Sequence, residues 1–287
     1  MSTLTTHTTA NRDSHSTGLC KFNTTSKAIE VSDGTDWLVY DYDFIALGAL
    51  TNANSFEFGG SDEYMTTSAV TSSATSGTVS LWVKTVSGST NNHLVSWSEA
   101  GQSQQFMNVR INPDGEPEVY YYVGSTLNIN TGGTVVSDNA WHHIALVSSG
   151  SAYSLYVDGV AETLTTSNGS NDGAWVNTIS SVDNTTIGAS RRNVISGGSR
   201  ALIDEVAIWD SALTSSQISQ VYNGGTPPNL NGLSPNAWYR MGDDASDAWD
   251  STNWTIVNAA TGGDTGIDMV SANMEEADKK TDPAIVT

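Results

Sequence analysis

Residues 141–164 constrain the fold of this chain more than any other segment. Side chains alternate between apolar and polar over 141–147, which is typical of a strand with one buried face. Residues 154–157 and 160–164 have the composition of two further strands, and Asp158-Gly159 joins them. Asp-Gly is a favoured pair for the two-residue type I′ turn of a hairpin. The segment therefore predicts three consecutive antiparallel strands.

Other strands are predicted on both sides of this segment. Residues 78–84 alternate clearly, and residues 106–111 and 118–123 flank Asn112-Pro113-Asp114-Gly115, a strong turn signal. Many short alternating strands separated by turns indicate an all-β sandwich or barrel.

One helix is predicted after the last of these strands. Thr214 and Gln217 have the spacing of a capping box, and Leu213 and Ile218 that of a hydrophobic staple. Gly224 is placed to end the helix.

Five motifs occur in the order seen in one known family. The chain resembles the laminin-G-like branch of the concanavalin A-like jelly rolls in Phe56-Glu57-Phe58 with Asp62-Glu63-Tyr64, Ser80-Leu81-Trp82, Trp141-His142-His143, Tyr156-Val157-Asp158-Gly159 and Ile203-Asp204-Glu205-Val206. The resemblance implies an all-β jelly-roll sandwich of two antiparallel sheets with one short helix. We expect this domain to occupy residues 46–226. The fold is used mainly for binding, and only some of its branches are enzymes.

Shorter segments are expected on either side of the jelly roll. In residues 1–45, strands at 19–22, 28–31 and 37–40 form a small β-meander, preceded by an aperiodic polar stretch at 1–17. The meander resembles a short module found near the N-termini of bacteriophage tail-fibre and other virion proteins. Residues 227–287 are expected to contain one returning strand near Trp238 and a flexible acidic tail.

The charge balance excludes some partners. With 11 basic and 31 acidic residues the formal net charge is −20, which disfavours nucleic acid and anionic membrane surfaces. The longest apolar run falls far short of the ~20 residues that span a bilayer, so no membrane insertion is expected. The N-terminus lacks the basic start and apolar run of a secretory signal peptide. The single cysteine, Cys20, allows no intrachain disulfide.

Calcium is the cofactor that the resemblance implies. Domains of this kind commonly hold Ca²⁺ with carboxylate and carbonyl oxygens. Asp62, after the opening strand, and Asp204, in the closing strand, are the candidate ligands. In the alternative interpretation Asp62 caps a turn and Asp204 accepts hydrogen bonds from the backbone.

Carbohydrate binding would use exposed aromatic rings. Tyr120, Tyr121 and Tyr122 are consecutive, so Tyr121 points away from its two neighbours and one face of the strand presents rings to solvent. We select Tyr121 and the loop residue Trp175 as candidate carbohydrate-binding residues. The alternative is that both rings pack in the core.

Catalysis is not expected. Retaining glucanases of this fold carry Glu-x-Asp-x-Glu on one strand, and no such triplet occurs here. Asp204 and Glu205 are adjacent, so a regular strand would send them to opposite faces.

These observations predict a non-enzymatic bacteriophage virion protein, either a capsid decoration or a tail component. It would lie on the particle surface, bind other virion proteins and itself, and contact host surface glycans. The alternative is a bacterial calcium-dependent carbohydrate-binding adhesin, and the third is a glycoside hydrolase.

Overall fold

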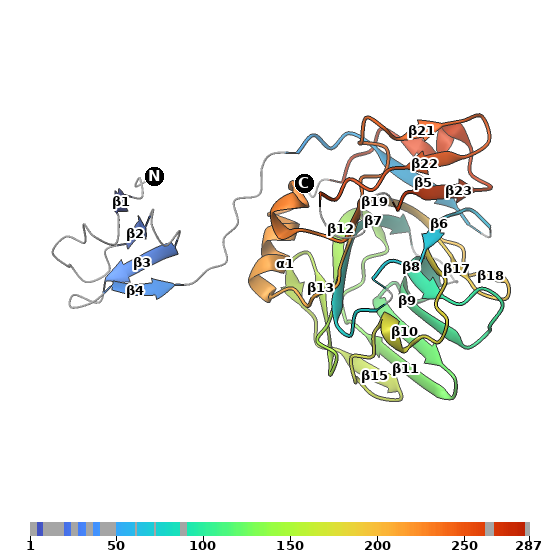
Figure 1. Ribbon diagram of the computed structural model, residues 1–287, viewed down its shortest axis with the longest axis horizontal. Helices are drawn as coiled ribbons and strands as arrows, with labels where there is room; N and C mark the ends of the chain where they lie inside the picture. Colours follow the sequence, from blue (N-terminus) through green and yellow to red (C-terminus); the bar gives the residue numbers. More distant parts are fainter. Residues whose placement is uncertain are drawn as a thin grey trace. The chain divides into compact units, whose positions relative to one another are not determined.

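The computed structural model describes residues 50–60, 62–71, 73–86, 91–261 and 267–284, together with the backbone of four strands nearer the N-terminus (Figure 1). The chain divides into two compact units, Met1–Ala46 and Leu47–Thr287.

The N-terminal unit contains a four-stranded sheet. In spatial order its strands are β1 (Thr5–His7), β2 (Cys20–Asn23), β3 (Ala28–Ser32) and β4 (Trp37–Tyr40). The last three are antiparallel and lie within one residue of the predicted meander. Strand β1 pairs in parallel with β2 and was not predicted, because Thr-Thr-His is too short to show an alternation. The side chains of this unit and the remainder of residues 1–17 lie outside the described residues.

The larger unit is built on two antiparallel sheets. The first, which we call the ten-stranded sheet, has the order β15 (Thr165–Asn168), β11 (Thr126–Thr131), β10 (Pro117–Val123), β9 (Gln105–Ile111), β8 (Asn92–Ser98), β16 (Asn184–Ile187), β6 (Tyr64–Ser68), β23 (Met269–Ala272), β22 (Trp254–Ile256) and β21 (Ala248–Trp249).

The second sheet is the eight-stranded sheet. Its order is β14 (Val160–Ala161), β13 (Tyr153–Val157), β12 (Asp138–Ser148), β7 (Gly77–Val86), β19 (Arg200–Trp209), β5 (Ser55–Gly59) and β24 (Lys279–Lys280), with β20 (Ala237–Tyr239) paired to β19. A small separate hairpin is formed by β17 (Ser190–Arg191) and β18 (Ile195–Ser196).

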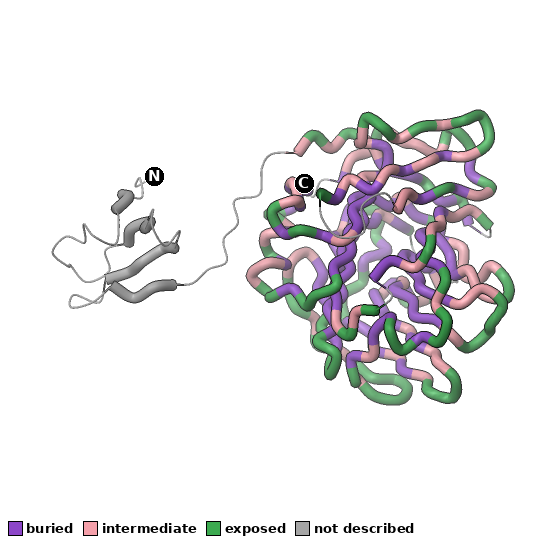
Figure 2. Tube along the Cα trace, in the orientation of Figure 1, coloured by how far each residue is buried: buried purple, intermediate pink, exposed green. Residues whose placement is uncertain are grey.

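The core lies between the two large sheets. Alternate residues of their strands are fully buried there, including Leu81 and Ile203 from one sheet and Val95 and Val109 from the other. Figure 2 shows the buried residues concentrated along the strands and the exposed ones in the connecting loops. Two sheets that bury one face each against the other form a stable sandwich. The predicted all-β jelly-roll sandwich is confirmed.

The predicted hairpin is present with the expected turn. Asp158 and Gly159 have φ of 50° and 75°, the two positive values that a type I′ turn requires. The strand after the turn is shorter than predicted, because β14 ends at Ala161 and the chain crosses to the ten-stranded sheet as β15.

The helix α1 (Ser215–Tyr222) begins with the predicted capping box between Thr214 and Gln217. Among the described residues, short 3₁₀-helices are η2 (Val176–Thr178), η3 (Leu230–Leu233) and η4 (Glu276–Asp278). In the part of the chain that the structure describes, no helix has the length and apolarity needed to cross a bilayer.

The C-terminal segment differs from its prediction. Strands β22 and β23 extend the ten-stranded sheet, and β24 pairs with β5 at the edge of the eight-stranded sheet. Asp282 then accepts hydrogen bonds from Lys84 Nζ at 2.7 Å and Trp141 Nε1 at 3.1 Å. The expected flexible tail was therefore wrong as far as residue 284. These strands are only two to four residues long, too short for their alternation to be recognised.

Candidate functional site

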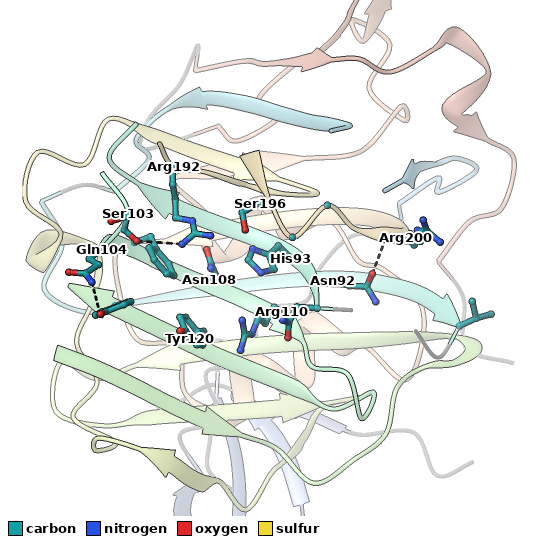
Figure 3. A pocket seen from close by; sticks show the side chains of 16 residues that line it. Asn92, His93, Ser103, Gln104, Asn108, Arg110, Tyr120, Arg192, Ser196 and Arg200 are labelled. Carbon is teal, nitrogen blue, oxygen red and sulfur yellow. Dashed lines mark hydrogen bonds between the residues drawn. The ribbon is translucent and has the colours of Figure 1, made fainter. Parts of the chain in front are cut away.

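A cavity of about 1120 Å³ lies on the face of β8, β9 and β10 that points away from the core. The β17–β18 hairpin folds over one side of it. Ser96 Oγ donates to Ser190 Oγ at 3.0 Å, and Ser98 Oγ donates to the Arg191 carbonyl at 2.6 Å. These bonds fix the hairpin, so the cavity has one wall from the hairpin and a floor from the sheet (Figure 3).

The strand register brings side chains from β8, β9 and β10 together on the floor. Because side chains alternate across a sheet, every second residue of β9 and β10 is on the cavity face, and a register shift between His93 and Val95 in β8 puts His93 and Ser96 in the same rows. The cross-strand rows are His93, Arg110 and Glu118; Ser96, Asn108 and Tyr120; and Ser98, Phe106 and Tyr122.

Aromatic rings and guanidinium groups alternate across the floor. Phe106 and Tyr120 stack with ring centroids 5.7 Å apart and an interplanar angle of 5°. Arg110 Cζ lies 4.0 Å from the Tyr120 centroid, and Arg192 Cζ lies 4.4 Å from the Phe106 centroid. Cation–π contacts of this kind hold both rings and both cations in place.

Several polar atoms in the cavity are buried and have no hydrogen-bond partner in the described structure. They are Asn91 Oδ1, His93 Nδ1, both amide atoms of Asn108, and Arg192 Nε. An unsatisfied buried polar group costs about 1–3 kcal/mol, so such groups are rarely grouped in one place without a reason. They are positioned to bond a ligand.

His93 is uncharged at neutral pH. Its side chain is 4% exposed. Burial, with smaller contributions from Arg110 and Arg192, lowers its pKa to about 3. The ring packs against Gly197, where an added Cβ would lie 2.4 Å from His93 Nε2. One ring nitrogen therefore donates and the other accepts.

The structure places the two predicted carbohydrate-binding residues in the core. Tyr121 is 4% exposed and donates to Thr178 Oγ1 at 3.0 Å, and Trp175 is 1% exposed and packs against Trp97. The predicted alternation is present, but Tyr121 is on the buried face and Tyr120 and Tyr122 are on the face toward the cavity. Selecting Tyr121 and Trp175 was therefore wrong, because neither ring is accessible to a sugar.

The two predicted calcium ligands do not meet. Strands β5 and β19 pair with Gly59 opposite Arg200, so Asp204 lies four residues along β19 from the end of β5, whereas Asp62 lies beyond that end, after the turn at Gly60. Asp204 is also fully buried, and no group of three or more His, Cys, Asp or Glu side chains that could hold a metal occurs in the described part of the chain. The residues do not fit one shared calcium ion.

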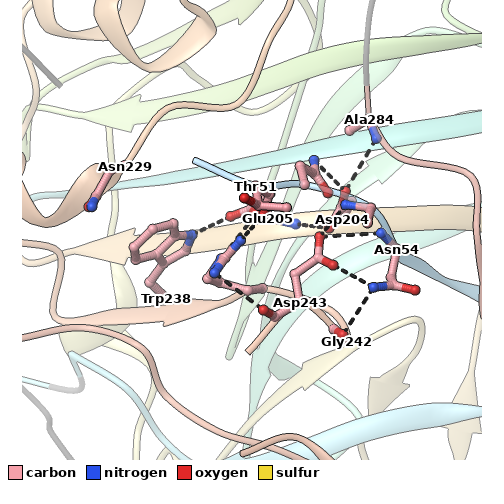
Figure 4. Close-up of polar contacts among 12 residues, drawn as sticks. Thr51, Asn54, Asp204, Glu205, Asn229, Trp238, Gly242, Asp243 and Ala284 are labelled. Carbon is pink, nitrogen blue, oxygen red and sulfur yellow. Dashed lines mark hydrogen bonds and ion pairs between the residues drawn. The ribbon is translucent and has the colours of Figure 1, made fainter. Parts of the chain in front are cut away.

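Asp204 and Glu205 are both buried on one side of β19, contrary to the sequence prediction. The β7–β19 register shifts between Asp204 and Ala207, and Glu205 has φ of 49°. This β-bulge inserts Glu205 as an extra residue, so that Val206 takes the core-facing position. Figure 4 shows both carboxylates in a network with Asp243, and none of the three residues lines the cavity described above.

The carboxylate oxygens in this network accept hydrogen bonds from neighbouring side chains and backbone. Asp204 Oδ2 accepts from Asn52 Nδ2 at 3.0 Å, and Glu205 Oε2 accepts from Trp238 Nε1 at 2.5 Å. Asp243 Oδ2 accepts from the backbone N–H of Ala53 at 2.8 Å. Since Asp204 and Glu205 are also no more than 2% exposed, the network has a structural role.

Comparison with known proteins gives the family. Residues 58–219, more than half of the chain, match the family model described as "Concanavalin A-like lectin/glucanases superfamily". The chain belongs to the concanavalin A-like lectin/glucanases superfamily. The predicted domain type is thereby confirmed. No curated protein matches the chain.

Several solved structures are similar to the chain. A putative carbohydrate-binding protein from Bacteroides ovatus is 21% identical with a TM-score of 0.54, covering 83% of this chain and 62% of that one. A sialidase carbohydrate-binding module from Ruminococcus gnavus is 14% identical with a TM-score of 0.49, and the match covers 60% of this chain and 100% of that one. A pentraxin from Limulus polyphemus is 17% identical with a TM-score of 0.48, and the match covers 76% of this chain and 99% of that one.

Most of the cavity residues of this superfamily member were not predicted from the sequence. Phe106, Asn108 and Arg110 have the spacing of one strand face, and Arg191-Arg192 is a rare basic pair in an acidic chain. Those signals were available. The sequence did not show that these residues meet in one cavity, because Arg192 comes from a hairpin about 80 residues later in the chain.

Proposed function

We propose that the chain is a non-enzymatic glycan-binding protein whose binding site is the cavity over β8, β9 and β10. The observation that carries this proposal is the combination of half-buried Tyr120 and Tyr122 rings with the unpaired polar atoms of Asn108 and His93. Sugars present apolar C–H faces that stack on aromatic rings and hydroxyl groups that bond amides. The cavity offers both kinds of contact.

Binding is favoured over hydrolysis by the residue types in the cavity. Glycoside hydrolysis requires two suitably spaced carboxyl groups. The residues described around the cavity include neither Asp nor Glu. Glu118, which extends the first cross-strand row, is 5% exposed and engaged by Arg110 and Thr131.

Binding of immobilised glycans by the purified chain tests this function. Tyr120→Ala and Asn108→Ala should each weaken binding about fivefold or more, since stacking and amide contacts are each worth at least about 1 kcal/mol. Tyr121→Phe is the matched control on the opposite face and should retain the affinity. Failure of a broad glycan panel to bind, or equal binding by the Tyr120 and Tyr121 variants, would refute the proposed site. Release of sugar from a bound polysaccharide would refute the non-enzymatic assignment.

We further propose that the chain is displayed on a bacteriophage particle, where it associates with itself and with other virion proteins. The support is the sequence resemblance of residues 18–37 to an N-terminal module of virion proteins. Mass spectrometry of purified particles should detect the chain in fixed proportion to the other virion proteins. Its absence from particles would favour the bacterial adhesin, and for a calcium-dependent adhesin EDTA should abolish glycan binding.

A further inference from the structure

The cavity has the opposite charge balance from the rest of the chain. The sequence contains 11 basic and 31 acidic residues. Three of the basic residues, Arg110, Arg192 and Arg200, line the cavity, while no carboxylate does so among the residues that the structure describes there. On so acidic a protein, a cavity lined by arginines and by no carboxylate is a local concentration of positive charge, and such a region attracts anions.

The three arginines differ in whether their charge is already paired. Arg110 Nε and Nη2 lie 2.7 Å and 2.5 Å from Glu118 Oε1, so its charge is neutralised by a buried carboxylate. Arg192 and Arg200 form no ion pair with any side chain in the described structure. The cavity therefore contains positive charge without a counter-charge of its own.

Arg192 is held in position over the floor of the cavity. Its guanidinium stacks on the buried ring of Phe106, and Nη1 donates to the Ser103 carbonyl at 3.4 Å, near the limit for a hydrogen bond. Its Nε is buried without a partner. Burial, with the repulsion from Arg110, lowers the pKa of Arg192. A guanidinium fixed in this way retains most of its donors for a ligand.

Neutral polar groups lie beside this cation. Asn108 is fully buried with both amide atoms unpaired, and His93 Nδ1 is buried and unpaired. Figure 3 shows Asn108 and His93 with Arg192 around the same space. Together they can donate to several oxygens of one ligand group while Arg192 balances its charge.

We propose that the saccharide bound in this cavity carries a carboxylate or a sulfate group, and that Arg192 pairs with that group. This inference rests on the proposed glycan-binding function and adds the chemical class of the glycan. Guanidinium groups bind carboxylate and sulfate through paired N–H donors. A neutral sugar would desolvate Arg192 without pairing its charge, which is unfavourable.

The test measures the affinity for probes that differ only in charge. The carboxylate probe is tri-galacturonic acid, compared with its methyl ester, and the sulfate probe is a sulfated galactan oligosaccharide, compared with its desulfated form. We expect at least about tenfold tighter binding of one charged probe than of its neutral counterpart. The pair that shows the difference identifies the anion. Raising the salt concentration should reduce that preference.

The variants assign the preference to one residue. Arg192→Gln should reduce the affinity for the charged probe about tenfold or more and leave the neutral probe unaffected. Arg200→Gln, at the exposed edge of the cavity, should give a smaller reduction. Arg191→Gln is the matched control, because it removes the same charge from the same hairpin but does not line the cavity.

The outcomes separate this inference from the function on which it rests. Equal or tighter binding of the neutral probes, or equal effects of the Arg191 and Arg192 variants, overturns the inference and leaves glycan binding standing. Failure of every glycan to bind overturns both. Circular dichroism of Arg192→Gln verifies that a loss of binding does not come from unfolding.

Discussion

Trp238 Nε1 donates to Glu205 Oε2 at 2.5 Å, and Glu205 occupies the extra position of a β-bulge in β19. Without the bulge, residue 205 would take the core-facing position that Val206 now holds. The bulge therefore keeps an acidic side chain out of the apolar core and places it against Trp238 and Arg240. Arg240 Nε lies 3.4 Å from Glu205 Oε1. Arg240 is the only basic side chain that forms an ion pair with this buried carboxylate in the described structure.

Glu205→Gln should change the pH dependence of stability. Burial raises the pKa of Glu205 to about 7 against an ordinary value of 4.5, although Arg240 and Trp238 act in the opposite direction. Because the folded-state pKa is raised, its stabilising contribution is complete below pH 4.5 and is lost as the pH rises through about 7. Wild-type free energies of unfolding should fall across this window, and the variant should show a flatter profile. Urea unfolding at several pH values measures this.

The control for that prediction is Glu276→Gln, which removes the same charge from an exposed position. It should reproduce the wild-type profile. If Glu205→Gln also reproduces it, the bulge carboxylate does not determine the pH dependence.

Asp282→Ala should destabilise the protein by about 1–2 kcal/mol. It removes the acceptor of Trp141 Nε1 and the partner of Lys84, an ion pair that is partly exposed and therefore weak. Asp282→Asn keeps an oxygen for Trp141 and should lose less than half as much. Thermal unfolding of the two variants distinguishes them, and equal stability of wild type and Asp282→Ala would mean that the C-terminal segment is not fastened by this side chain.

Gly197→Ala should damage both stability and glycan binding. At φ of +64° an alanine is strained by about 1–2 kcal/mol, and its Cβ would also meet His93 Nε2 at 2.4 Å. Gly224 has the same φ of +64° but nothing within 4 Å of the added Cβ, so Gly224→Ala carries the strain alone. Only Gly197→Ala should reduce glycan affinity. Equal affinity of the two variants would show that the position of His93 is unimportant.

Trp175→Phe should reduce stability without reducing glycan affinity. The residue is buried between the sheets, and its Nε1 has no partner in the described structure, so the variant loses packing and no hydrogen bond. We expect a loss of about 1–3 kcal/mol. Val160→Ala, at a position 67% exposed, should be close to wild type. If Trp175→Phe lost glycan affinity while its free energy of unfolding stayed unchanged, the prediction would be wrong and Trp175 would take part in glycan binding.

Local chemistry determined much of the fold from the sequence by itself. The Asp158-Gly159 turn and the Thr214–Gln217 capping box each depend on neighbouring residues, and both are present as predicted. The strand around Trp141 is also present, but the prediction of one buried face was wrong, because consecutive residues from His143 to Val147 are buried on both faces. These features follow from φ preferences, hydrogen bonding between nearby residues and the two-residue period of a strand. The same alternation showed that Tyr121 points away from Tyr120.

The tertiary structure alone decided which face of that strand is buried. A period of two is the same for either face, and only the packing of the second sheet places Tyr121 in the core and Tyr120 at the cavity. The bulge at Glu205 and the approach of Arg192 to Phe106 depend likewise on contacts between segments distant in the chain. Residue types and spacing predicted the sandwich, whereas the position of its binding cavity required the long-range packing of the folded chain.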